Sequence, residues 1–151
     1  MDIQAATEAQ KSSPKKILIF FYNPNSKASQ RMENSTFGNA QLSNSINANY
    51  YPVMFDVTNG NNLTINERTF APSQTGGLHQ YAKFMNITSV PSIVFVDENS
   101  LPVTIVNGAV TAKELDPYIK LIAGQDYLKI DSQERWNAEQ AKLKTKRKDL
   151  D

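Results

Sequence analysis

Two serines, Ser26 and Ser29, stand three residues apart where an apolar segment gives way to a predicted helix. Side chains three apart share one face of a helix, so both hydroxyls would project from the same side of its first turn. On residue type alone, the simplest interpretation is an N-cap serine followed by a polar first-turn residue. No Gly-x-Ser-x-Gly motif accompanies them, so a serine nucleophile of the hydrolase type has no support.

His79 is the single histidine, and the chain contains no cysteine. A zinc site needs three or four such ligands, and His79 has no obvious second one. A triad of Ser26, His79 and an aspartate is equally unsupported by any spacing. We therefore expect no metal site and no cofactor.

The length of the chain is that of one domain with a substantial hydrophobic core. A chain of 151 residues buries about two-thirds of its unfolded surface. The 16 basic and 15 acidic residues nearly cancel, which gives no electrostatic reason to expect a nucleic-acid partner. No apolar run approaches the roughly 20 residues of a membrane span. The polar amino terminus does not resemble an uncleaved signal peptide, although an exported protein expressed without its signal would look the same.

The elements that would position the serines can be predicted from the pattern. Residues 1–14 are polar and indicate a flexible lead-in or a short extra helix. Ile17 to Tyr22 is a continuous apolar run typical of a strand buried on both faces. Asn23-Pro24-Asn25 ends it with a turn, and Ser26 caps a helix that bends or restarts near residues 35–39.

Further strands and helices follow along the chain. We expect strands or hairpins at residues 50–57, 63–65 with 68–70, 90–97 and 101–106, and helices at 77–86 and 112–123, the last capped by Thr111. A parallel pair with a helical crossover, followed by an antiparallel hairpin, predicts an α/β fold: a central mixed β-sheet flanked by helices on both faces, with a small hairpin insertion.

These landmarks together resemble the thioredoxin superfamily. Ile17 to Phe37 is similar to its first strand and active-site helix, and Ser89-Val90-Pro91-Ser92 is similar to its cis-proline loop. Val106 to Ala109, with the helix that follows, is similar to its last strand and final helix. The resemblance covers about residues 15–124, with 125–151 as a C-terminal helical extension. A narrower resemblance is to periplasmic members of the superfamily. Their active site reads Cys-x-x-Cys-Lys-x-Met-Glu, followed by Thr-Phe, and the matching residues here are Ser26 to Glu33, followed by Thr36-Phe37.

The resemblance implies a thiol:disulfide oxidoreductase mechanism. In the family, a thiol at position 26 attacks a disulfide, a second thiol at position 29 resolves the mixed disulfide, and neighbouring residues bind the substrate. The positions that match are Ser26 and Ser29 as the catalytic pair, with Val90, Pro91, Lys27 and Ala28 as substrate-binding residues. A hydroxyl stays protonated near neutral pH and forms no such link, so the chain as written is predicted to be redox inactive.

Two explanations for the serines stay open. Both cysteines were replaced by the nearest isostere, or the chain is a naturally redox-dead thioredoxin-like protein-binding module. Asn25 stands where family members usually have Trp, and Phe20 where many place a buried acid. Glu33 is a nearby acid, but an exposed helical glutamate is the simpler interpretation.

The same resemblance carries expectations about partners and location. Protein substrates with thiols or disulfides and a redox partner protein are implied, in a periplasmic or otherwise extracytoplasmic location, with the cytoplasm as the alternative. Residues 142–148 hold five Lys or Arg. This basic end is interpreted as solvated, with contact to acidic lipid or nucleic acid as the alternative.

Overall fold

A computed structural model describes residues 1–124 of the chain. The predicted C-terminal helical extension and the basic end lie outside these residues. The described residues form two compact units, one made of residues 1–30 and 50–109 and the other of residues 31–49 and 110–124. None of the described helices is long and apolar enough to cross a membrane.

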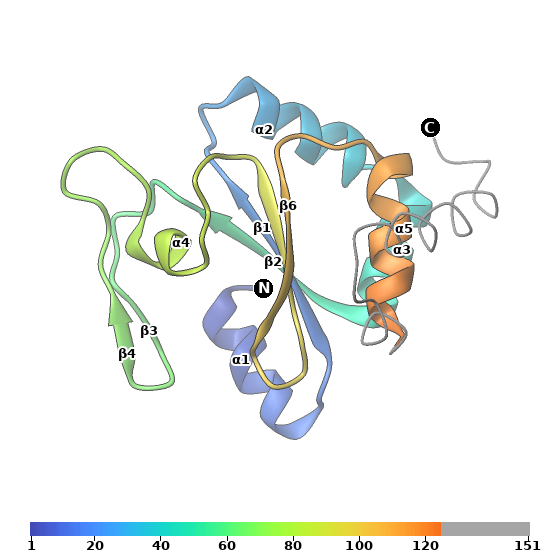
Figure 1. The fold of residues 1–151 in the computed structure, drawn as a ribbon, viewed down its shortest axis with the longest axis horizontal. Helices are drawn as coiled ribbons and strands as arrows, with labels where there is room; N and C mark the ends of the chain where they lie inside the picture. The colour runs from blue at the N-terminus through green and yellow to red at the C-terminus, as the bar shows by residue number, and fades with distance from the viewer. Residues whose placement is uncertain (125–151) are drawn as a thin grey trace. The chain divides into compact units, whose positions relative to one another are not determined.

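The first unit is built on a four-stranded mixed sheet in the order β2-β1-β5-β6 (Figure 1). Its strands are β1 (Lys16–Tyr22), β2 (Tyr50–Asp56), β5 (Ser92–Val96) and β6 (Pro102–Asn107). Strand β1 pairs parallel with β2 and antiparallel with β5, and β5 pairs antiparallel with β6. The predicted mixed sheet is therefore confirmed, with a parallel pair and a returning hairpin.

Strand β1 is the centre of the packing. Every residue from Lys16 to Phe21 is buried, as expected for a strand with no polar face. Because side chains alternate across a sheet, Ile17, Ile19 and Phe21 share one face. They belong to one apolar cluster with Val53 and Phe55 of β2.

The amino-terminal residues are folded, which corrects the expected flexible lead-in. Residues Ile3–Ser12 form helix α1, and the Asp2 carboxylate caps it by accepting a hydrogen bond from the Ala5 amide at 2.7 Å. Ile3 and Ala6 join the apolar cluster, which provides the burial that a polar helix needs to be stable. Of the two alternatives given for residues 1–14, a flexible lead-in or a short extra helix, the structure contains the helix.

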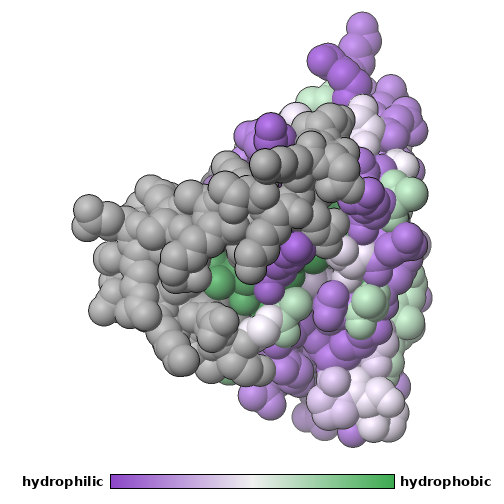
Figure 2. All heavy atoms as spheres, turned by 90° about the vertical axis from the view of Figure 1, so that its right-hand side faces the viewer, coloured by the Kyte–Doolittle hydropathy of each residue, from purple (hydrophilic) through white to green (hydrophobic). Residues whose placement is uncertain are grey.

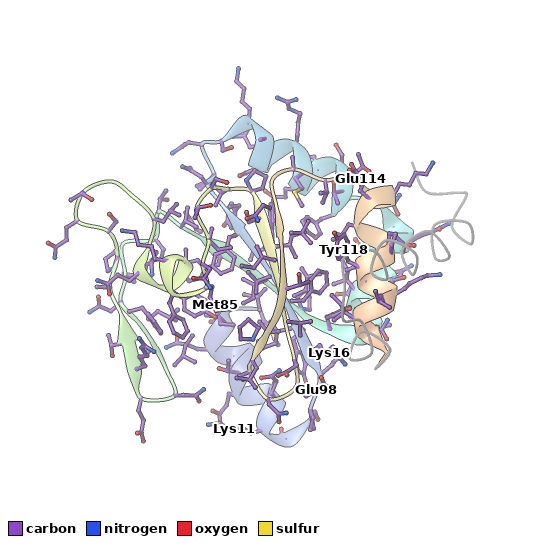
Figure 3. The ribbon with its side chains drawn as sticks, viewed as in Figure 1. Lys11, Lys16, Met85, Glu98, Glu114 and Tyr118 are labelled. Carbon is purple, nitrogen blue, oxygen red and sulfur yellow. The ribbon has the colours of Figure 1, made fainter. Side chains whose placement is uncertain are left out.

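A buried glutamine joins α1 to the sheet. The Gln10 amide donates to the carbonyls of Lys15 and Asp97, both at 2.8 Å, and its oxygen accepts from the Ser100 hydroxyl at 2.7 Å. Beside this contact, the Lys16 ammonium lies 3.1 Å from Glu98 (Figure 3). One side chain therefore ties α1 to the start of β1 and to the β5–β6 turn.

The predicted hairpin insertion is present as a second, two-stranded sheet. Strands β3 (Leu63–Ile65) and β4 (Arg68–Phe70) are joined by Asn66 and Glu67, whose φ angles are 50° and 68°. Positive φ at both central residues matches the right-handed twist of a hairpin. Phe70 is buried and its ring lies 5.3 Å from that of Tyr81 on helix α4 (Gln80–Phe84).

The helices that follow the serine turn begin in the first unit and continue in the second, which starts at Arg31. Helix α2 (Lys27–Arg31) leads into a π-helical turn, η1 (Met32–Thr36), and α3 (Ala40–Asn49) begins after Gly38. A Cβ at Gly38 would lie 2.1 Å from the Asn34 carbonyl oxygen, so glycine is needed at the predicted break. Within this unit α3 contacts α5 (Ala112–Ala123).

Thr111 is the N-cap of helix α5, as predicted. The Thr111 hydroxyl accepts from the Glu114 amide and the Glu114 carboxylate accepts from the Thr111 amide, both at 3.1 Å, forming a capping box. The buried apolar side chains of α5 include Leu115, Ile119 and Ile122. On the surface shown in Figure 2, the described residues are mostly hydrophilic, with smaller hydrophobic areas.

Replacement of Thr111 tests this capping box. Thr111→Ala removes the acceptor for the Glu114 amide and is expected to lower the free energy of unfolding by about 1 kcal/mol. The measurement is urea unfolding followed by circular dichroism. Thr111→Ser, which keeps the hydroxyl, is the matched control, and equal stability of the two variants would contradict the prediction.

Replacement of Gln10 tests the attachment of α1. Gln10→Ala leaves buried polar groups without their partners and is expected to lower the free energy of unfolding by about 1–3 kcal/mol. The control is Glu8→Ala, which removes only the exposed ion pair to Lys11 and is expected to cost less than about 0.5 kcal/mol. A Gln10 variant as stable as the Glu8 variant would show that α1 is not held in this way.

Candidate active site

The turn after β1 is fixed by the side chain and backbone of Asn23. The Asn23 carbonyl accepts from the Ser26 amide and its side-chain oxygen accepts from the Asn25 amide, both at 2.9 Å. Such an Asx turn is a local preference of asparagine. It stops the strand and directs the chain into helix α2.

Ser26 is the N-cap residue of α2, as predicted. Its Oγ accepts a hydrogen bond from the Ser29 amide at 3.2 Å, and its carbonyl accepts from the Gln30 amide at 3.0 Å. The residue is half-buried, so part of it is accessible from the surface.

Ser29 occupies a different environment on the same turn. It is 1% exposed, and its Oγ accepts from the Asn23 amide at 3.3 Å. Each serine oxygen thus accepts a backbone N–H, one at a half-exposed position and one at a buried position. Backbone donors directed at these two atoms favour a negative charge there.

The Val90–Pro91 loop leaves the sheet at the same end as this turn. The Val90–Pro91 peptide bond is cis, and the Pro91 carbonyl accepts from the Gly108 amide at 2.9 Å. Ser92 at the start of β5 pairs with Phe21 near the end of β1. The residues before Ser92 and those after Tyr22 therefore leave the two strands at the same end (Figure 1). The structure therefore brings the two predicted halves of the site to the same end of the sheet.

The predicted binding residues differ in exposure. Val90 is half-buried and Pro91 is buried, and within residues 1–124 no hydrogen bond is found to the Val90 backbone. Lys27 is exposed and Ala28 half-buried on the first turn of α2. Within the described residues Lys27 forms no ion pair.

Phe20 has a structural role at the place where many thioredoxins have an acid. It is 2% exposed, and its ring stacks on Tyr22 with centroids 5.6 Å apart. No proton acceptor therefore stands at this position. Asn25 and Glu33 are both exposed, in agreement with the simpler interpretation of Glu33.

His79 is likewise structural. It is fully buried, its Nδ1 accepts from the Tyr81 amide at 3.1 Å, and its Nε2 lies 2.9 Å from the Asn61 carbonyl. The carbonyl requires the hydrogen on Nε2, so the ring caps α4 and holds the loop at Asn61. Among the described residues no three His, Cys, Asp or Glu side chains form a metal-binding group.

Asn23, predicted only as a turn residue, contacts both serines. Its amide donates to the Ser29 Oγ, and its carbonyl accepts from the Ser26 amide. Its side-chain oxygen accepts from the Asn25 amide, which precedes Ser26. The Asn-Pro-Asn pattern predicted the turn, but the cross-contact to Ser29 depends on the helix starting at residue 27 and not one residue later.

Comparison with solved structures gives the fold. A thioredoxin-fold protein from Helicobacter pylori superposes with a TM-score of 0.69 at 12% identity, over 91% of this chain and 87% of that one. A thioredoxin from Thermus thermophilus gives 0.62 at 12%, over 83% and 86%. The oxidised DsbD C-terminal domain from Neisseria meningitidis gives 0.54 at 18%, over 78% and 87%.

Sequence comparison gives the family. No curated protein sequence matches this chain significantly. The profile of the thioredoxin-like domain family matches residues 3–123, which includes α1 as well as the sheet, the serine turn and α5. The chain therefore belongs to the thioredoxin-like domain family.

Proposed function

We propose that this chain has the scaffold of a thiol:disulfide oxidoreductase acting on protein substrates, with serine at the nucleophile and resolving positions. The observation that carries the proposal is the pairing of a half-exposed Ser26 with a buried Ser29 on one helical turn, each accepting a backbone N–H. A nucleophile must reach a substrate, whereas a resolving group acts only after the substrate is attached. The difference in exposure matches those two roles.

With sulfur at both positions the exchange proceeds in two steps. A thiolate at position 26 attacks one sulfur of a substrate disulfide, forms a mixed disulfide and releases the other substrate sulfur as a thiolate. A thiolate at position 29 then attacks the sulfur at position 26, which frees the second substrate sulfur. The substrate is reduced by two electrons and the 26–29 pair is oxidised to a disulfide.

The serine oxygens keep the hydrogen bonds and lose this chemistry. A hydroxyl is not ionised near neutral pH, and an oxygen–sulfur or oxygen–oxygen link would not take the place of the disulfide. The chain as written therefore binds substrates without exchanging electrons with them.

Substrate binding is assigned to the loop at Val90 and Pro91. The Val90 backbone has its N–H and C=O without partners in the described structure, so an extended peptide can pair with it as an added strand. Lys27 and Ala28 flank the same helix start and would contact the segment next to the reacting sulfur. An extracytoplasmic location, where protein disulfides persist, fits this substrate class.

The second candidate function is a naturally redox-dead module that binds proteins through the same loop. Phe20 favours it, because a buried aromatic ring gives no route for the proton that a resolving thiol must lose. Asn25, exposed just before Ser26, is a further departure from an active thioredoxin. The two functions share a binding surface and differ in whether restored sulfur atoms react.

Restoring both cysteines separates the two functions. The unmodified chain is expected to give no turnover in dithiol-driven insulin reduction, because it has no sulfur at positions 26 and 29. Ser26→Cys with Ser29→Cys is expected to form an internal disulfide and to reduce insulin, while Ser26→Cys alone stops at the mixed disulfide. Turnover by the unmodified chain would refute the inactive assignment, and a double variant that neither forms the disulfide nor reduces insulin would refute the enzyme scaffold.

The two positions are also expected to differ in accessibility. A thiol in Ser26→Cys should react with an aromatic disulfide reagent at least about tenfold faster than a thiol in Ser29→Cys, because reactivity requires access as well as thiolate. The rates are measured by absorbance under native conditions, with the same variants in denaturant as the control. Equal native rates, or a faster Ser29 variant, would contradict the assignment of roles.

A further inference from the structure

A cavity lies at the end of the first unit opposite to the serine turn. It has a volume of about 290 Å³ and is bordered by α1, the β3–β4 hairpin, α4 and β6. Ile17 at the start of β1 and its partner Val96 line its base. Ser26 follows the end of the same seven-residue strand, so about 20 Å of strand separates the two places.

The interior of the cavity is apolar and its mouth is rimmed by exposed hydrophobic residues. Ile3, Phe70 and Met85 are buried side chains of the wall, and Figure 3 labels Met85 next to α4. At the mouth, Phe84 is 49% exposed and Leu101 is 59% exposed. Exposed apolar groups that border a hollow are typical of a binding site.

One cation stands at this mouth. The Arg68 guanidinium lies 4.5 Å from the Phe84 ring centroid and 5.4 Å from that of Phe70, so two aromatic faces hold it by cation–π contact. Within residues 1–124 no carboxylate forms an ion pair with it. Its planar set of donors remains available for an anion.

Two amides extend the polar part of the rim. Asn66 and Asn86 line the cavity beside Arg68, and within residues 1–124 the side chain of neither makes a hydrogen bond. Both residues have positive φ, 50° and 62°, conformations that asparagine adopts more readily than most residues. The rim thus combines one guanidinium with two amide groups above an apolar interior.

We propose that this cavity binds a small amphipathic carboxylate, with an apolar chain inside and its headgroup at Arg68. A guanidinium pairs with a carboxylate through two parallel hydrogen bonds, and a single cation matches a single negative charge better than a polyanion. The volume of about 290 Å³ lies just below the usual range for ligand pockets, about 300–1,000 Å³, and so favours a small ligand. A medium-length acyl chain satisfies both the size and the polarity of the site.

The test is a titration of the full chain with decanoate below its micelle concentration, followed by amide chemical shifts. Saturable shifts are expected at residues 65–70, 84–86 and 100–105, with none at residues 23–30. Decanol, which has the chain without the charge, is expected to bind at least about twofold more weakly. Failure to saturate, or shifts confined to the serine turn, would overturn the proposal.

Variants separate the headgroup from the cavity. Arg68→Gln is expected to weaken decanoate binding about two- to fivefold, the effect of losing one accessible ion pair, and to leave decanol binding unchanged. Lys83→Gln removes the same charge from the neighbouring exposed position on α4 and is the matched control. Ile105→Trp fills the cavity and is expected to abolish binding of both ligands.

Each variant result bears on a separate part of the proposal. Equal decanoate binding by the Arg68 and Lys83 variants would overturn the choice of a carboxylate. Undiminished binding by a folded Ile105 variant, checked by circular dichroism, would overturn the choice of this cavity. If that variant does not fold, the wild-type shift map alone decides the location.

Discussion

The burial of β1 from Lys16 to Phe21 constrains the first unit more than any other feature. A strand with no polar face must be covered on both sides and paired on both edges, because its backbone groups and its apolar side chains cannot remain in water. β2 and β5 pair with β1 on its two sides. Residues of α1, α4 and the hairpin cover the face of β1 that carries Ile17, Ile19 and Phe21. The position and register of the other strands follow from these requirements.

The candidate site is a consequence of where that burial ends. Tyr22 is the last residue of β1 and is half-buried, and beyond it the backbone loses its strand partners. Asn23 supplies partners instead: its carbonyl takes the Ser26 amide and its own amide reaches Ser29. The helix starts there because the asparagine turn and the Ser26 cap together satisfy donors that neither strand nor helix can satisfy. The site is therefore held by backbone N–H groups that donate both to carbonyls and to the side-chain oxygens of Asn23, Ser26 and Ser29.

The sequence specified most elements whose signals are local. Ile17 to Tyr22, Thr111 and the turn at Asn66-Glu67 each carry a pattern that a few neighbouring residues determine, and each forms the expected structure. Helix α1 was ambiguous because its stability comes from distant contacts, Ile3 and Ala6 in the cluster and Gln10 bonded to Asp97. The approach of Asn23 to Ser29, the capping by His79 and the cavity at Arg68 depend on tertiary placement, so no local pattern indicated them.

The serine pair shows how such a scaffold separates stability from reactivity. An oxygen at position 29 accepts the Asn23 amide and an oxygen at position 26 accepts the Ser29 amide, so neither donor is left without a partner when sulfur is absent. A weaker acceptor such as sulfur would form longer and weaker bonds to the same amides. The turn and the helix start are therefore fully hydrogen-bonded at these two donors without a cysteine at either position. Since the backbone donors are part of the turn and not of the side chains, the geometry that would activate a thiol persists in a chain that has none.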